Sequence, residues 1–172
     1  MATNPKEIAD RSFVAIKING KNYFGNPNET ILDVSKRNGI EIPHLCFKEG
    51  MRPDGNCRAC MVEIEGERVL QPSCVRTISD GMVVNTNNDR VIHSQKLVLE
   101  LLTSDVSDKI YKKDSELSDW AERLNIKANR FPTNVQEKHD LTHPAIAVNL
   151  DACIQCTLSL IHISEPTRPS SI

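Results

Sequence analysis

The chain has 172 residues, of which 39% are hydrophobic and 4% aromatic, so one ordinary domain with a mostly aliphatic core is expected and a disordered chain is excluded. Its 21 Lys and Arg against 23 Asp and Glu give a net charge of −2, which argues against a nucleic-acid partner. The longest uncharged run, residues 152–164, is 13 residues long, shorter than the ~20 apolar residues of a membrane span. Residues 1–11 show no secretory signal, so we expect a cytoplasmic protein, in which disulfides are rare.

The first half of the chain has the pattern of a small sheet with one helix. Alternating apolar residues and the hairpin signal Asn19-Gly20 predict paired strands. Thr30 and Asp33 form a capping-box pattern where the helix begins. The expected strands cover residues 13–18, 21–24, 61–64, 68–70 and 82–85, and the expected helix covers 31–37. This order predicts an α+β fold of the β-grasp type.

After residue 88 the apolar period changes to that of amphipathic helices. One helix is expected over residues 89–103, and a second from 114 or 115 to 124. The residues expected to face inward are Val91, Leu97, Val98, Leu101 and Leu102 in the first helix and Leu117, Trp120, Ala121 and Leu124 in the second. A polar linker, residues 131–140, and a short apolar segment, residues 145–150, follow.

Four of the six cysteines follow the spacing Cys46-x10-Cys57-x2-Cys60-x13-Cys74. A two-iron cluster needs two thiolates on each iron, and four cysteines converging from loops meet that requirement. The nearby Gly55 lets backbone N–H groups point at sulfur, which would offset the negative charge of a cluster and its thiolates. Two alternatives remain open at this point, a tetrahedral zinc site and buried cysteines that act as small hydrophobic residues.

The run from Pro43 through Gly55-Asn-Cys-Arg-Ala-Cys60 to Cys74 resembles the [2Fe–2S] domain at the front of large oxidoreductase subunits. These are the 75-kDa-type subunit of respiratory NADH dehydrogenase and the alpha subunit of NAD-dependent, molybdopterin-containing formate dehydrogenase. The resemblance implies a ferredoxin-like β-grasp domain, with Cys46, Cys57, Cys60 and Cys74 as the four cluster ligands. Phe47 departs from the residue that usually follows the first cysteine in the respiratory subunit.

A second cysteine motif lies in residues 148–156 (VNLDACIQC). It resembles the opening of the two-cluster ferredoxin segment of the same subunits, which implies that Cys153 and Cys156 are half of a [4Fe–4S] ligand set. Taken alone, a Cys-x2-Cys pair could also be a redox pair, half of a zinc site or two unrelated thiols. The start of this second motif argues against a free-standing small ferredoxin.

The stretch 101–124 contains no cysteine and no histidine. Many of the related subunits hold a further [4Fe–4S] cluster there with one His and three Cys, so this cluster is expected to be absent. Some formate dehydrogenase alpha subunits resemble this ligand-poor version, including a segment like His143-Pro144-Ala145, and the formate dehydrogenase resemblance is therefore favoured over the respiratory one. The resemblance implies an electron-transfer role with a partner subunit that carries flavin and binds NAD. It places [4Fe–4S] clusters and molybdopterin only in the complete native chain.

No phosphate-binding glycine loop, nucleophile elbow or paired acid–base constellation is visible, so no catalytic residue is assigned.

The stretch 158–168 (LSLIHISEPTR) resembles a translated sequencing adapter, which implies that the native sequence differs after about Thr157. The expected divisions are residues 1–9 as a disordered N-terminus, 10–88 as the [2Fe–2S] domain, 89–130 as a helical segment, 131–157 as a linker with the truncated start of a [4Fe–4S] domain, and 158–172 as an artefactual tail.

Overall fold

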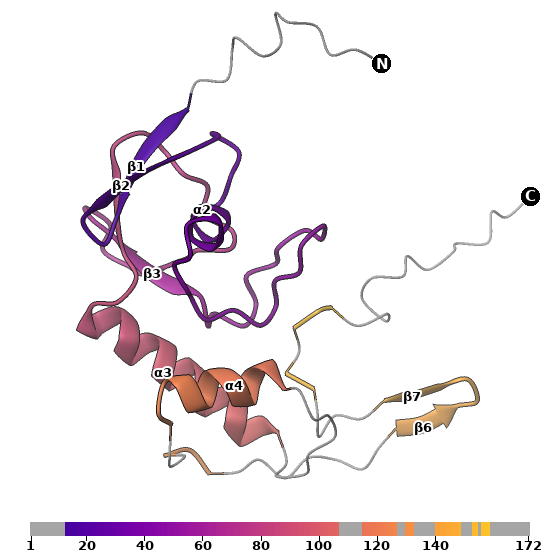
Figure 1. Cartoon of the computed structure of the whole chain (residues 1–172). Coiled ribbons are helices and arrows are strands. Elements are labelled where there is room, and N and C mark those ends of the chain that lie inside the picture. Colours follow the sequence, from indigo (N-terminus) through magenta and orange to yellow (C-terminus); the bar gives the residue numbers. More distant parts are fainter. Residues whose placement is uncertain are drawn as a thin grey trace, which may run out of the picture.

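A five-stranded sheet forms the main body of the computed structural model, which describes residues 13–106, 115–126, 130–132, 140–148, 153–154 and 156–158. Its strands are β1 (Val14–Ile18), β2 (Lys21–Gly25), β3 (Met61–Ile64), β4 (Gln71–Pro72) and β5 (Met82–Asn85), in the order β2-β1-β5-β3-β4. The helices are α2 (Ile31–Arg37), α3 (Asp89–Asp105) and α4 (Glu116–Arg123), and a separate hairpin joins β6 (Asp140–His143) and β7 (Ile146–Val148). Figure 1 shows α2 beside the sheet and the pair α3 and α4 below it.

The sheet has the β-grasp arrangement that the sequence predicts. Strand β1 pairs antiparallel with β2 and parallel with β5, so the first and last strands of the domain lie together at its centre. The turn between β1 and β2 places Asn19 at φ 49° and Gly20 at φ 82°. Two successive left-handed residues give the turn a twist that matches the twist of the paired strands, which is why Asn-Gly favours this hairpin.

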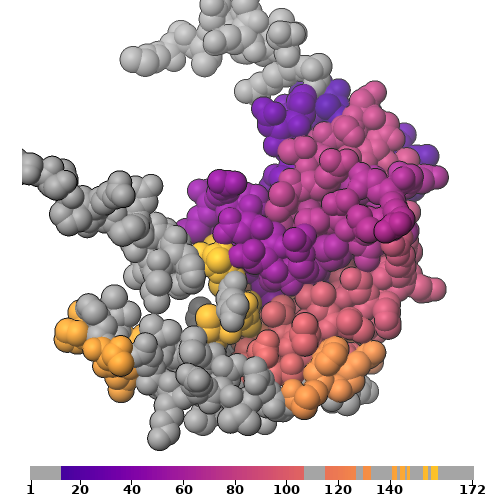
Figure 2. Space-filling model, turned by 180° about the vertical axis from the view of Figure 1, so that it is seen from behind, coloured from indigo at the N-terminus to yellow at the C-terminus, as the bar shows by residue number. Residues whose placement is uncertain are grey.

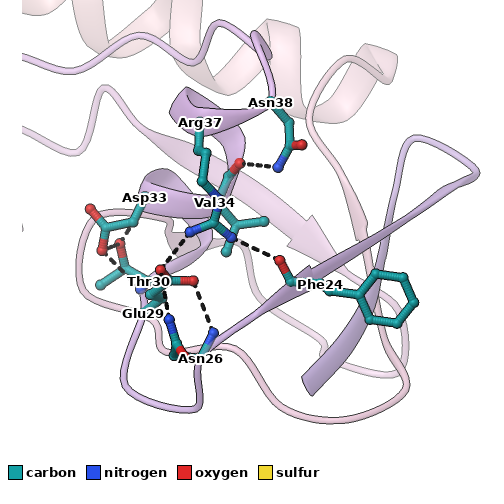
Figure 3. A network of polar contacts seen from close by, with 8 residues as sticks. All are labelled: Phe24, Asn26, Glu29, Thr30, Asp33, Val34, Arg37 and Asn38. Carbon is teal, nitrogen blue, oxygen red and sulfur yellow. Dashed lines mark hydrogen bonds and ion pairs between the residues drawn. The ribbon is translucent and has the colours of Figure 1, made fainter. Parts of the chain in front are cut away.

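A network of polar contacts caps the N-terminal end of helix α2 and holds the helix in place (Figure 3). The Thr30 hydroxyl accepts from the Asp33 backbone N–H at 3.2 Å, and the Asp33 carboxylate accepts from the Thr30 N–H at 3.0 Å, so the predicted capping box is confirmed. Arg37, in the last turn, pairs with Glu29 at 2.5 Å and donates to the Phe24 carbonyl of β2 at 2.8 Å. Arg37 therefore ties the C-terminal turn of the helix to the edge strand β2.

The main core lies between α2 and the sheet. Ile31, Leu32 and Val34 of α2 are fully buried, and burying each such side chain stabilises the fold by about 1.5–3 kcal/mol. The buried members of this core are Ile16, Ile18, Ile31, Leu32, Val34, Ile42, Cys60, Val62, Ile64, Cys74, Ile78, Met82 and Val84. Aliphatic side chains dominate it, in agreement with the low aromatic content.

A second apolar core lies where α3 and α4 pack against the loop before β3. Its buried members are Leu45, Cys46, Cys57, Ala59, Leu99 and Leu117. Trp120 and Leu124 of α4 pack against them, so the predicted inward face of the second helix is confirmed. Two of the cysteines of the first motif thus belong to the main core and two belong to the second core.

Two expectations about local structure are wrong. The strand expected over residues 68–70 lies instead at Gln71–Pro72, where Gln71 pairs with Val62 and Pro72 with Met61. The Arg68 carbonyl, outside the strand, accepts from Arg90 at 2.7 Å. In α3 the expected inward residue Leu101 is 48% exposed. The residues that α3 buries are Val91, Gln95, Leu99, Glu100 and Ser104.

The polar residues buried by α3 have partners that a helical hydrophobicity pattern does not reveal. Gln95 donates to the Met61 carbonyl of β3 at 3.0 Å, and Glu100 pairs with Arg130 at 2.5 Å. A buried polar group whose hydrogen bonds are satisfied carries little penalty, so these residues can replace leucines on the inner face.

Several expectations fall outside the described residues. They are the disordered N-terminus (1–9), the loop 107–114, most of the linker (133–139) and the tail from residue 159 onward. Among the helices of the described residues, none is long and apolar enough to cross a membrane.

Candidate metal centre

Three loop segments bring the four cysteines of the first motif together. Cys46 directly follows Leu45, and both lie in the second core, while Cys60 directly precedes β3. Between them, Arg58 has φ +57°, which turns the chain back on itself so that Cys57 and Cys60 both face inward. Cys74 follows β4, whose pairing with β3 brings it beside Cys60.

All four thiols are buried, with exposures of 2% for Cys46, 6% for Cys57, 1% for Cys60 and 0% for Cys74, and none is in a disulfide. The thiols of Cys57 and Cys74 both donate toward Cys46 and lower its pKa well below the usual range. The Cys74 thiol also lowers the pKa of Cys60, while the pKa values of Cys57 and Cys74 are raised. The four sulfurs therefore form one interacting group, in which Cys46 interacts with both Cys57 and Cys74, and Cys74 also interacts with Cys60.

Backbone N–H groups surround this group of sulfurs. The Cys57 N–H donates to Cys46 Sγ at 3.5 Å, and the Asn56 N–H adds to the lowering of the Cys46 pKa. The N–H groups of Ala59 and Cys74 act in the same direction on Cys57 and Cys60, respectively. Donors of this kind favour the thiolate over the thiol, which is the state that binds metal. Among the described residues, no three or more His, Cys, Asp or Glu side chains are placed to hold a single metal ion.

Glycine is required at position 55 in this loop. Gly55 has φ +67°, and a Cβ atom there would lie 2.9 Å from Cγ2 of Val75, the residue after Cys74. The loop before Cys57 therefore passes close to the loop that carries Cys74, and a larger residue at position 55 would force the Val75 side chain to move.

Ser73 was not identified from the sequence, although its side chain reaches the site. It is fully buried, and its hydroxyl adds to the lowering of the Cys60 pKa, after the larger effect of Cys74. Its position directly before a ligand candidate was the one available signal, and a single serine is too common for that signal to be decisive.

The loop that carries Cys46 is joined to α4 by contacts between aromatic rings. The His44 ring lies 5.9 Å from Phe47 and 6.3 Å from Trp120, and Arg123 lies over the Trp120 ring at 5.0 Å. His44 Nδ1 is also 2.8 Å from the Ile42 carbonyl oxygen. The described contacts of His44 are therefore with rings and backbone, so it serves to attach α4 to the cysteine loop.

The second cysteine motif lies against the first one (Figure 2). Ile154 and Cys156 pack on the second core, and the Thr157 hydroxyl donates to the Asp54 carboxylate at 2.6 Å. Cys153 and Cys156 are both half-buried. Residues about a hundred positions apart in the sequence thus bring the two motifs into contact.

The comparison with known families agrees with this geometry. Residues 11–89 match the family described as 2Fe-2S iron-sulfur cluster binding domain. The matched range contains Cys46, Cys57, Cys60 and Cys74, and it ends where α3 begins.

Relatives extend the match beyond the [2Fe–2S] domain. The chain is 35% identical over 84% of its length to the HndD subunit of the NADP-reducing hydrogenase of Solidesulfovibrio fructosivorans, and 33% identical over 83% to a subunit of the NADH-quinone oxidoreductase of Rhizobium meliloti. These alignments span 26% and 18% of the two relatives, so the chain is much shorter than either. The crystal structure of an NAD+-reducing [NiFe]-hydrogenase in the H2-reduced state matches with a TM-score of 0.75 and 26% identity, covering 84% of this chain and 63% of that one.

Proposed function

We propose that Cys46, Cys57, Cys60 and Cys74 hold one [2Fe–2S] cluster and that the chain transfers single electrons through it. The observation that carries this proposal is the burial of the four thiols in one interacting group, with Cys46 and Cys57 in the second core and Cys60 and Cys74 in the main core. A [2Fe–2S] cluster is held by four thiolates, two on each iron, so Cys46 and Cys57 would bind one iron and Cys60 and Cys74 the other. When bound, the cluster supplies reversible one-electron chemistry.

The chain's own residues provide the environment for that chemistry. The first pair of cysteines packs in the second core and the second pair in the main core, so the site lies at the boundary between the two cores. This placement excludes water from the sulfurs and fixes them from both sides. The backbone donors around Cys46 and Cys60 compensate the negative charge of the thiolates and thereby adjust the potential.

The test is reconstitution of the chain with iron and sulfide. We expect about two irons per chain, the visible absorption of a [2Fe–2S] cluster and one EPR signal after reduction. Replacing any one of Cys46, Cys57, Cys60 and Cys74 with serine should abolish the cluster and destabilise the loop, because metal-binding energy is also folding energy. Cys153→Ser is the matched control and should retain the cluster. Binding of zinc without iron, or loss of the cluster in the control, would contradict the proposal.

For the larger protein we propose the alpha subunit of a formate dehydrogenase, acting in the cytoplasm. The sequence of residues 101–124 supports this choice, because it lacks the His and Cys ligands that many respiratory subunits carry there. In the complete protein, Cys153 and Cys156 would contribute to a [4Fe–4S] cluster, and molybdopterin would serve formate oxidation. Electrons would pass to a partner subunit that carries flavin and meets NAD.

A second candidate is the large iron–sulfur subunit of NADH-quinone oxidoreductase, which the 33% identity to the Rhizobium meliloti relative favours. The two are distinguished by the electron donor that reduces the [2Fe–2S] cluster in the enzyme purified with its complete native subunits. Formate should bleach the cluster absorption if the first proposal is right. Reduction by NADH with no response to formate would favour the second.

A further inference from the structure

Ser73 has a backbone that is fixed on both sides and a side chain that is entirely enclosed. Its N–H donates to the Cys60 carbonyl at 2.9 Å, and its own carbonyl accepts from the Leu32 N–H of α2 at 3.0 Å. The residue is 0% exposed. Its side chain is therefore enclosed at a fixed backbone position, directly before Cys74.

The Ser73 hydroxyl has no hydrogen-bond partner among the described residues. A buried hydroxyl without a partner is costly, and native structures rarely leave one without a reason. Ser73 lies opposite Cys60, one position beyond the Met61–Pro72 pair of β3 and β4, and opposed residues of an antiparallel pair extend their side chains to the same side. The pKa of Cys60, which is lowered first by the Cys74 thiol and further by Ser73, agrees with this placement. A neutral thiol is a weak acceptor, whereas a metal-bound thiolate carries negative charge and is a better one.

We propose that Ser73 is a tuning residue, whose hydroxyl donates a hydrogen bond to the Cys60 ligand sulfur and raises the reduction potential of the cluster. This inference rests on the proposed function, because it requires Cys60 to be a ligand. It explains why a fully buried hydroxyl without a protein partner is placed next to a cysteine of the site.

The direction of the effect follows from charge. Reduction adds one electron, taken from a reduced dye mediator in the titration, and it forms or breaks no covalent bond. The added negative charge is shared by the ligand sulfurs, so a donor at Cys60 stabilises the reduced state more than the oxidised state. Removing the donor should therefore make the cluster harder to reduce.

The experiment is a redox titration of the reconstituted chain, followed by absorption and EPR. At the midpoint potential of the unmodified chain, Ser73→Ala should lower the ratio of reduced to oxidised cluster by roughly three- to tenfold, the effect of one hydrogen bond. Ser35→Ala is the matched control, because the Ser35 hydroxyl on α2 is also fully buried and without a partner in the described structure. This control should leave the ratio unchanged.

A second pair of variants covers the case in which the alanine variant does not fold. Ser73→Thr and Ser73→Val have the same bulk and differ by the hydroxyl, so the threonine variant should titrate at the higher potential. Equal potentials in the two, or an unchanged potential in Ser73→Ala, would overturn the inference, as would an equal shift in Ser35→Ala. If the unmodified chain assembles no [2Fe–2S] cluster, it is the proposed function that fails, and iron analysis shows this before any titration.

Discussion

Replacing Gly55 with alanine is expected to destabilise the chain by about 2–3 kcal/mol through two separable effects. The first is backbone strain, because Gly55 has φ +67° and an alanine in this region costs about 1–2 kcal/mol. The second is a steric overlap, because the new Cβ would lie 2.9 Å from Val75 Cγ2. Val75 is 44% exposed and can move, which keeps the steric cost near the lower end of the range for overpacking, at about 1 kcal/mol.

Two companion variants separate these effects. Gly50 lies in the same loop with φ +82° and has open space around its Cα, so Gly50→Ala should show the backbone cost alone, about 1–2 kcal/mol. Adding Val75→Ala to Gly55→Ala should recover about 1 kcal/mol, the steric part of the cost.

The assay is urea unfolding of these variants and the unmodified chain, with iron analysis of the reconstituted chains as a second readout. Gly55 lies two residues before Cys57, so we expect Gly55→Ala to retain less iron than Gly50→Ala. Equal destabilisation of the two glycine variants, or no recovery on adding Val75→Ala, would refute the close approach of the two loops.

Three further outcomes are expected. Leu99 is fully buried in the second core, so Leu99→Ala should lower the free energy of unfolding by about 2–5 kcal/mol, measured with urea. It should also lower iron retention, because Cys46 and Cys57 pack in the same core. Unchanged iron binding would argue against that coupling. Glu29→Gln should cost about 1 kcal/mol at neutral pH. Because Arg37 lowers the pKa of Glu29 in the folded state, this cost should fade as the pH falls below the unfolded value of about 4.3; a cost that persists in acid would contradict the ion pair. Asp54 accepts from Thr157, the residue after Cys156, so Asp54→Ala should speed alkylation of Cys156 roughly severalfold, measured by mass spectrometry. Asp80→Ala is the control and should leave the alkylation rate unchanged. Equal rates in the two variants would show that the Thr157 contact does not hold the second motif in place.

Local features of the fold could be predicted from the sequence because their causes lie within a few residues. The Thr30 and Asp33 capping box spans three positions, and the Asn19-Gly20 turn needs two. The spacing of the four cysteines likewise predicted their grouping, since any chain that joins them into one site must bring these loops together. Their role as cluster ligands stays a prediction.

Other features depended on partners far away in the chain. The place of β4 was decided by its pairing with Met61 and Val62 of β3. The buried face of α3 was decided by Met61 and Arg130, which satisfy Gln95 and Glu100. A hydrophobic pattern records how apolar a residue is, but a polar side chain can be buried once a distant group supplies its hydrogen bond.

The surroundings of the sulfurs were decided in the same way. The sequence by itself determined which cysteines form the candidate site and which helix and hairpin support it. Only the tertiary structure placed Ser73 against Cys60, Val75 over Gly55 and Thr157 on Asp54, at separations of 13, 20 and 103 positions. Such contacts form when the two cores close around the loops, and no local preference of the chain encodes them.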